Sequence, residues 1–254
     1  MRSATELRQR WLETIPRVMA RTRMYARDGR EMETVGRTLL ENLCFVDERD
    51  DDFAAVGGMF AGRYGEFGVH GPFAAMFGRD RGCVEEVASV YAEQFHRLGY
   101  LEVGRVLGES AWNALIGEVR GRFGERDMRR DEVEAAFGAP GLVVGGRVLC
   151  YVSAAGEWAF FDCWDEPVQR YVPGRGTYES VSEGAPLVRS VRVPADDVEG
   201  GLVLTLYGKV LRWGTGWWIH HPGADAAEES LAIAAQLRAV EAADPSSGLG
   251  RGLA

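Results

Sequence analysis

Residues 148–164 read VLCYVSAAGEWAFFDCW, and this stretch decides the fold of the second half of the chain. It contains two apolar runs, 148–152 and 158–164, separated by a short segment of small and polar residues. Runs of this length that flank a turn containing Gly156 are typical of an antiparallel β-hairpin. The sequence therefore predicts two neighbouring strands here.

Downstream of this hairpin, the alternation with a period of two continues. We expect one strand over 187–193 and a second hairpin whose arms are 202–213 and 217–220. Because no long helical pattern separates these segments, the strands are expected to pair in antiparallel fashion. A last helix is predicted over 226–242, and the tail 244–254, which contains Pro, Ser and Gly, is predicted to be disordered.

Upstream of the hairpin, apolar residues recur at helical spacing. Ser3 and Glu6 form a capping-box pattern, which predicts a first helix that runs to about Thr14. Pro16 suits the first turn of a second, short helix. The acidic run 47–52 is expected to be a solvated loop. The same periodicity predicts further helices over 32–46, 84–98, 110–123 and 131–137.

The segment 57–82 has an unusual composition, with eight glycines interleaved with five aromatic residues. Glycine weakens a regular helix, whereas aromatic side chains favour burial. We therefore expect a compact loop with short helical turns that packs on the helices. The alternative is a mobile lid or ligand-binding loop in which His70 contacts the ligand.

These patterns predict an α+β fold, with a helical N-terminal half followed by a mainly antiparallel β-sheet half and a C-terminal helix. The polar stretch 124–130 is the predicted boundary between two subdomains. The first is a helical subdomain over 1–125, and the second is an α+β subdomain over 126–243. Whether they form one domain or two packed units stays open.

Composition and charge narrow the class of protein. The formal net charge of −9 disfavours a general nucleic-acid binder, because the summed field repels phosphate. No apolar stretch approaches the roughly 20 residues that span a bilayer, and the Arg-containing N-terminus lacks the apolar core of a secretory signal. Lys209 is the only lysine beside many arginines, which indicates a high-GC bacterial genome. We expect a cytoplasmic protein with no membrane partner.

Sequence motifs for the common cofactors are absent. The chain contains no phosphate-binding G-x-x-x-x-G-K-[ST] loop, no dinucleotide fingerprint, no nucleophile elbow and no H-E-x-x-H zinc motif. The four cysteines are widely separated and predict reduced, mostly buried thiols. No cofactor and no metal site is predicted, and whether the protein is an enzyme stays open.

Asp162 and His220 are the candidate catalytic residues. Alternation along the strand places Asp162 on the same face as Trp158 and Trp164, and a desolvated carboxyl with a raised pKa would suit proton transfer in an aromatic cleft. The competing interpretation is that Asp162 is exposed or paired with an arginine. His220, near the end of the 217–220 arm, is either an acid, base or ligand, or a histidine that packs at the end of its strand.

The candidate binding residues fall into two groups. Residues 1–37 contain nine arginines against five acidic residues, and such a segment suits phosphate or an acidic protein surface, although a solvated helix face is the simpler interpretation. Its candidates are Arg21, Arg23 and Tyr25. The second group comprises tryptophans of the predicted sheet: Trp158, Trp164, Trp213 and Trp218.

The leading functional interpretation is a non-catalytic, protein-binding or regulatory bacterial protein of the inhibitor or immunity-protein kind. It would present its aromatic sheet or its helical N-terminal surface to a protein partner. The alternative is an enzyme or small-molecule-binding protein of a specialised bacterial pathway, which uses a cleft around Asp162 and His220. A nucleic-acid partner is the least expected.

Overall fold

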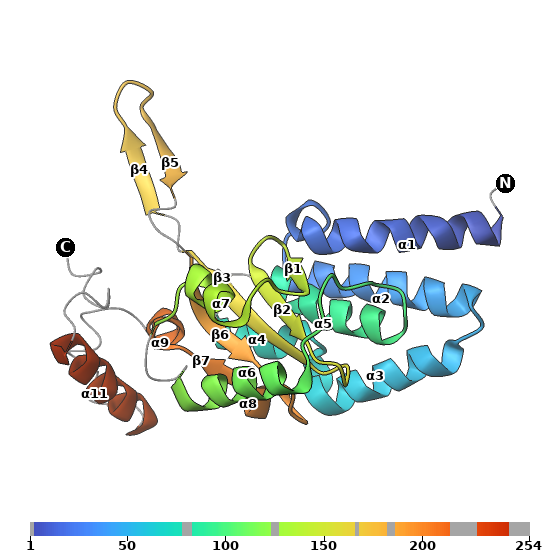
Figure 1. Cartoon of the computed structure of the whole chain (residues 1–254). Coiled ribbons are helices and arrows are strands. Elements are labelled where there is room, and N and C mark those ends of the chain that lie inside the picture. The colour runs from blue at the N-terminus through green and yellow to red at the C-terminus, as the bar shows by residue number, and fades with distance from the viewer. Residues whose placement is uncertain are drawn as a thin grey trace.

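The protein folds as a central antiparallel sheet with helices on both faces (Figure 1). This computed structural model describes residues 3–77, 83–122, 127–165, 168–181, 186–213 and 228–243. The predicted α+β class is confirmed, because the helices of the N-terminal half precede the strands of the second half. No helix in the described ranges combines the length and apolarity needed to cross a membrane.

Among the described residues, the main sheet has five strands in the order β1-β2-β3-β6-β7, and every neighbouring pair is antiparallel. The predicted hairpin over 148–164 is confirmed, with Cys150 opposite Phe160. The strand predicted over 187–193 is confirmed as β6. The strands are β1 Leu142–Val144, β2 Val148–Val152, β3 Trp158–Trp164, β6 Leu187–Arg192 and β7 Leu202–Leu204.

Side chains from the two central strands enter two different hydrophobic cores. Cys150 and Phe160 face the N-terminal helices, whereas Tyr151 and Phe161 face the opposite side. This alternation follows from the period of two along a strand. Because both faces of the sheet are covered, Trp158 is only 2% exposed, and the aromatic residues of β3 do not form an outer surface.

The N-terminal layer consists of helices that surround α5. All but one of the α5 residues between Val84 and Phe95 are buried, because α5 lies between the sheet and α2. Gly36 of α2 allows this close approach, since a Cβ there would lie 2.4 Å from the Tyr91 ring. The elements are α1 Ala4–Ala20, η1 Thr22–Met24, α2 Gly29–Val46, α3 Asp50–Tyr64, η2 Gly65–Phe67, α4 His70–Phe77 and α5 Val84–Arg97.

Helix α1 continues through Pro16, so the predicted break near Thr14 is wrong. The capping box formed by Ser3 and Glu6 is confirmed. A proline in a helix costs about 3 kcal/mol because it removes one backbone hydrogen bond and crowds the preceding turn. Ile15 and Val18, on either side of the proline, are both buried, and their burial keeps the helix continuous.

Helix α3 replaces two segments that were predicted to be loops. Asp50 and its two acidic neighbours form the first turn, where negative charge interacts favourably with the helix dipole. Gly57, in the glycine-rich segment, is also helical, so the loop prediction is wrong over 57–64. Burial of Tyr64 and the edge-to-face packing of Phe60 on the Tyr64 and Tyr91 rings outweigh the low helix propensity of glycine.

Two helices cover the opposite face of the sheet. They are α6 Glu109–Arg122 and α7 Arg130–Phe137. The predicted starts are displaced by one or two residues, because Ser110 lies inside the first turn of α6 and Arg129 is the residue that precedes α7. Gly138 ends α7 with a φ of 76°, as the sequence predicts.

The second predicted hairpin is wrong in its first arm. Only β7 is a strand, and Leu206–Trp213 forms helix α9. The Thr205 hydroxyl accepts a hydrogen bond from the Gly208 amide at 3.0 Å, which caps the helix and stops the strand. The arm over 217–220 lies outside the described residues. A short helix, α8 Val198–Gly201, precedes β7, and the predicted last helix is confirmed as α11 Glu228–Ala243.

A separate two-stranded hairpin, which the sequence analysis missed, projects away from the body of the protein (Figure 1). Its strands are β4 Val168–Val172 and β5 Thr177–Val181, and within the part of the chain that the structure describes they pair only with each other. Gly174 and Gly176 adopt φ values of 93° and 64° in the connecting turn. This left-handed backbone favours glycine, so the two residues fix the turn.

Candidate functional site

Asp162 lies in the interior between the sheet and α5, and 3% of its surface is exposed. It pairs across the sheet with Ser190, but the next residue, Cys163, pairs with Val188, so Arg189 is the extra residue of a β-bulge. The bulge directs the Arg189 side chain to the face that carries Asp162. Arg189 Nε donates a hydrogen bond to Asp162 Oδ2 at 2.5 Å.

Glu86 of α5 completes a buried charge cluster, which we define as Glu86, Arg147, Asp162 and Arg189. The guanidinium groups of Arg147 and Arg189 both donate hydrogen bonds to Glu86 Oε1. Arg147 Nη2 also lies 3.1 Å from Asp162 Oδ1. Two carboxylates and two guanidinium groups therefore balance in formal charge inside the protein.

Aromatic rings enclose the charge cluster. The guanidinium carbon of Arg189 lies 3.8 Å from the centre of the Phe77 ring and 4.3 Å from the centre of the Trp164 ring. The guanidinium carbon of Arg147 lies 4.4 Å from the same Trp164 ring. Contacts of this kind stabilise a cation that is removed from water. Trp164 therefore contacts Arg147 and Arg189, the two arginines that pair with Asp162. This agrees with the prediction that Trp164 and Asp162 lie on the same face of the strand.

The pKa values of the two carboxyl groups of the charge cluster are shifted in opposite directions. Burial raises the pKa of Glu86 to about 7, against the attraction of Arg147 and with the support of the negative charge on Asp162. Burial acts on Asp162 in the same sense, but Arg147 and Arg189 outweigh it and lower the pKa of Asp162. The catalytic interpretation of Asp162 requires a raised pKa, so the lowered pKa argues against it.

The space beside Asp162 is too small for a substrate. A cavity of about 10 Å³, about the size of one water molecule, lies between Glu86, Ser89, Asp162 and Ser190. Asp162 is paired with an arginine, which is the competing interpretation in the sequence analysis. A catalytic role for Asp162 therefore has no geometric support among the described residues.

Arg23 is connected to the rim of the charge cluster. Its Nε donates a hydrogen bond to Glu85 Oε1 at 2.7 Å, and its Nη2 donates to Oε2 at 3.1 Å. The Thr22 hydroxyl donates a further bond to Glu85 at 3.0 Å. Arg147 Nε lies 3.5 Å from the same carboxylate. Arg23 therefore attaches η1 to α5, although half of its side chain remains exposed.

The other predicted site residues are scattered. His70 lies at the start of α4, where its amide and its ring Nδ1 contact the Glu33 carboxylate of α2. Arg21 and Tyr25 are exposed at the surface, and Trp158 is stacked on Phe160 in the core. The Trp213 side chain, Trp218 and His220 lie outside the described part of the structure.

The cysteines lack the properties of a nucleophile or a metal ligand. All four are free and buried, which confirms the prediction from the sequence. Burial raises the pKa of Cys83 and of Cys163 to about 12, so neither thiol forms a thiolate near neutral pH. Across the described ranges, no group of three or more His, Cys, Asp or Glu side chains is arranged to hold a metal ion.

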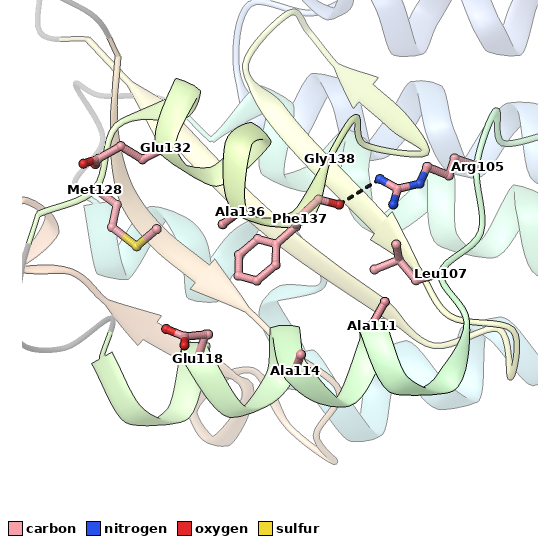
Figure 2. A pocket seen from close by; sticks show the side chains of 10 residues that line it. All are labelled: Arg105, Leu107, Ala111, Ala114, Glu118, Met128, Glu132, Ala136, Phe137 and Gly138. Carbon is pink, nitrogen blue, oxygen red and sulfur yellow. Dashed lines mark hydrogen bonds between the residues drawn. The ribbon is translucent and has the colours of Figure 1, made fainter.

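A pocket with a volume of about 590 Å³ lies between α6 and α7, on the sheet face opposite the charge cluster (Figure 2). None of its residues is among the site residues predicted from the sequence. Three alanines on facing helices, which leave space between them, are the only signal that the sequence carried. The lining residues are Arg105, Leu107, Ala111, Ala114, Glu118, Met128, Glu132, Ala136, Phe137 and Gly138.

The pocket has charged groups at opposite ends. Figure 2 shows the Arg105 side chain beside Gly138 at one end, and the carboxylates of Glu118 and Glu132 near Met128 at the other. Arg105 Nη1 donates hydrogen bonds of 2.8 Å to the carbonyl oxygens of Phe137, the last residue of α7, and of Ala139, and these bonds hold the guanidinium in place. The arrangement can bind a ligand with separated charges.

The projecting hairpin carries two exposed aromatic residues. Tyr171 and Tyr178 are directly opposite each other in the register of β4 and β5. Their ring centres are 5.4 Å apart, and the residues are 52% and 69% exposed. Arg175 and Glu179 form an ion pair of 3.0 Å near the turn. The hairpin thus presents a preformed aromatic surface.

Comparisons of the chain with protein families, with curated proteins and with solved structures gave no match.

Proposed function

We propose that this is a non-catalytic binding protein that engages a protein partner through the β4–β5 hairpin. The exposed pair of Tyr171 and Tyr178 carries the proposal. Tyrosine is enriched at the centres of protein interfaces because it offers a large contact area at low conformational entropy cost. The free, buried thiols fit a reducing compartment, so we place the interaction in the bacterial cytoplasm.

The hairpin offers backbone hydrogen-bonding groups as well as exposed aromatic rings. β4 and β5 pair with each other and with no other described strand, so the outer edge of each strand offers unpaired amide and carbonyl groups. A lone two-stranded ribbon is marginally stable in water, and it gains stability when another chain covers it. The partner that fits is a protein that adds an extended segment to one edge and packs a side chain against the tyrosines.

The aromatic residues of the main sheet, which the sequence suggested as a contact surface, are not part of this proposed interface. Trp158 and Phe160 are enclosed between the sheet and the N-terminal helices, so they are not available to a partner. Arg23 is occupied by Glu85. Arg21 and Tyr25 remain exposed on the N-terminal segment and offer a second, smaller contact surface.

Site-specific photo-crosslinking in the native host tests the proposal. A photoreactive phenylalanine analogue is introduced at Tyr178 and, as a matched control, at Phe67, which is also exposed. We expect one stoichiometric protein adduct at position 178 and none at position 67. The Tyr171→Ala/Tyr178→Ala variant should lose the partner, by at least about tenfold in affinity, while its unfolding midpoint stays unchanged.

Two results would contradict the proposal. One is crosslinking at position 178 that is no stronger or more specific than at position 67. The other is a partner that binds the double tyrosine variant as tightly as the original protein. In either case the β4–β5 hairpin is not the contact surface.

A further inference from the structure

The pocket between α6 and α7 has the size of a small-molecule site. Its volume of about 590 Å³ lies within the range of roughly 300–1,000 Å³ that is typical of ligand pockets. Ala111 and Ala114 of α6 face Ala136 of α7, so short side chains keep the two helices from filling the space. Leu107 and Phe137 contribute apolar surface.

Arg105 provides a fixed positive charge at one end. Its Nη1 bonds the carbonyl oxygens of Phe137 and Ala139, and its guanidinium lies over Gly138, where a Cβ would be 2.5 Å from Nη1. No carboxylate of the described residues pairs with Arg105, and its Nε and Nη2 form no hydrogen bond with them. A guanidinium held in this way is prepared to bind an anion through its remaining donors.

Glu132 provides negative charge at the other end. Its Oε2 accepts the Arg129 amide at 2.8 Å, which orients the carboxylate at the start of α7. Glu118 lines the same end of the pocket from α6. A second anionic group of a ligand would be repelled there, whereas an ammonium group would be attracted.

We propose that this pocket binds a small zwitterion: a carboxylate that meets Arg105, an ammonium group that meets Glu132 and Glu118, and an apolar body between them. The apolar body lies against Leu107, Met128 and Phe137. This binding does not depend on the β4–β5 hairpin, so the two proposals stand or fall separately.

A series of ω-aminoalkanoic acids with six, eight and twelve carbons tests the charge pattern. Binding is followed by protein NMR and calorimetry, beside the straight-chain carboxylic acid and the straight-chain amine of each length. We expect at least one aminoalkanoic acid to bind, and to bind about tenfold more tightly than either singly charged analogue of equal length.

Variants at the two ends separate the roles of the charges. Arg105→Gln should weaken binding of the aminoalkanoic acid about tenfold and should weaken the plain carboxylic acid similarly, without affecting the amine. Glu132→Gln should affect the amine and leave the carboxylic acid unchanged. Arg120→Gln, an exposed arginine of α6 outside the pocket, is the matched control and should change nothing.

A variant that fills the pocket tests the binding site without changing Arg105 or its hydrogen bonds. Ala114→Trp should abolish binding because the indole occupies the pocket, whereas Asn113→Trp, on the neighbouring exposed position of α6, should leave binding intact. The proposal is overturned if no member of the series binds, if the singly charged analogues bind equally well, or if binding survives Ala114→Trp.

Discussion

The Arg189 side chain reaches Asp162 because the β-bulge in β6 places both residues on the face of the sheet that meets α5. Neither side chain has more than slight access to water. Two opposite charges that are removed from water together are tolerated when each is hydrogen-bonded, whereas a single buried charge is strongly unfavourable. The ion pair of Arg189 and Asp162 is therefore a stability requirement.

Asp162→Asn should destabilise the protein by about 3 kcal/mol or more, because Arg189 loses one of its two buried counter-charges and Arg147 loses one of three. Denaturant unfolding gives the free energy directly. Asp196→Asn, at an exposed position, is the control and should change the free energy by less than about 0.5 kcal/mol. Equal stability of the two variants would show that the charge cluster does not support the fold.

The unfolding free energy should depend on pH through Glu86. A glutamate in the unfolded chain releases its proton near the ordinary value of 4.5, whereas burial raises the pKa of Glu86 in the folded protein to about 7. Between these values the folded state binds more protons than the unfolded state, so this contribution to stability is full below pH 4.5 and is lost as the pH rises to about 7.

Comparison with Glu86→Gln isolates that contribution from other titrating groups. The difference in unfolding free energy between the original protein and the variant should change by on the order of 1–3 kcal/mol between pH 4.5 and pH 8, in the direction that disfavours the original protein at high pH. A difference that stays constant over this range would mean that Glu86 is already ionised at pH 4.5.

Gly208→Ala should disrupt the contact between α9 and β6. A Cβ at this position would lie 1.8 Å from the Arg189 carbonyl oxygen, a backbone atom that cannot move away without shifting the bulge. We expect a loss of at least about 2 kcal/mol in denaturant unfolding. Gly58→Ala in α3 is the control, since a Cβ there meets nothing within 4 Å, and it should be neutral or stabilising by about 0.5–1 kcal/mol.

Amide hydrogen exchange should be much faster in the β4–β5 hairpin than in the β2–β3 hairpin. Amides of β4 and β5 should exchange rapidly, because the ribbon projects from the body and no other described strand covers its edges. Amides of β2 and β3, at the centre of the main sheet, should be among the most protected. Equal protection of both hairpins in the isolated protein would indicate that the β4–β5 surface is already covered.

Local patterns were enough to predict much of this fold. The alternation in 148–164 identifies both central strands, and it correctly places Asp162 on the face of Trp158 and Trp164. Helical periodicity identifies α2 and α5. In these segments the residues that are apolar in sequence are also the residues that are buried, so periodicity and burial agree.

The remaining features depend on contacts between distant residues. Nothing in the sequence around Arg189 indicates that a bulge turns its side chain toward Glu86 of α5. The apolar run that follows Leu202 fits a strand and a helix equally well, and the cap at Thr205 decides between them. The pocket escaped prediction because its residues come from separated segments and several are alanines.

The hydrophobic core between the sheet and the N-terminal helices affects how the chain folds during its synthesis. It combines residues of α1–α5 with Val148, Cys150, Trp158 and Phe160, so it includes residues from both sides of the predicted boundary near residue 125. On the ribosome, α5 emerges before the strands that cover it, and at roughly 5–20 residues per second the interval lasts several seconds. During that interval the nascent chain exposes an apolar helix surface, which is a binding site for chaperones.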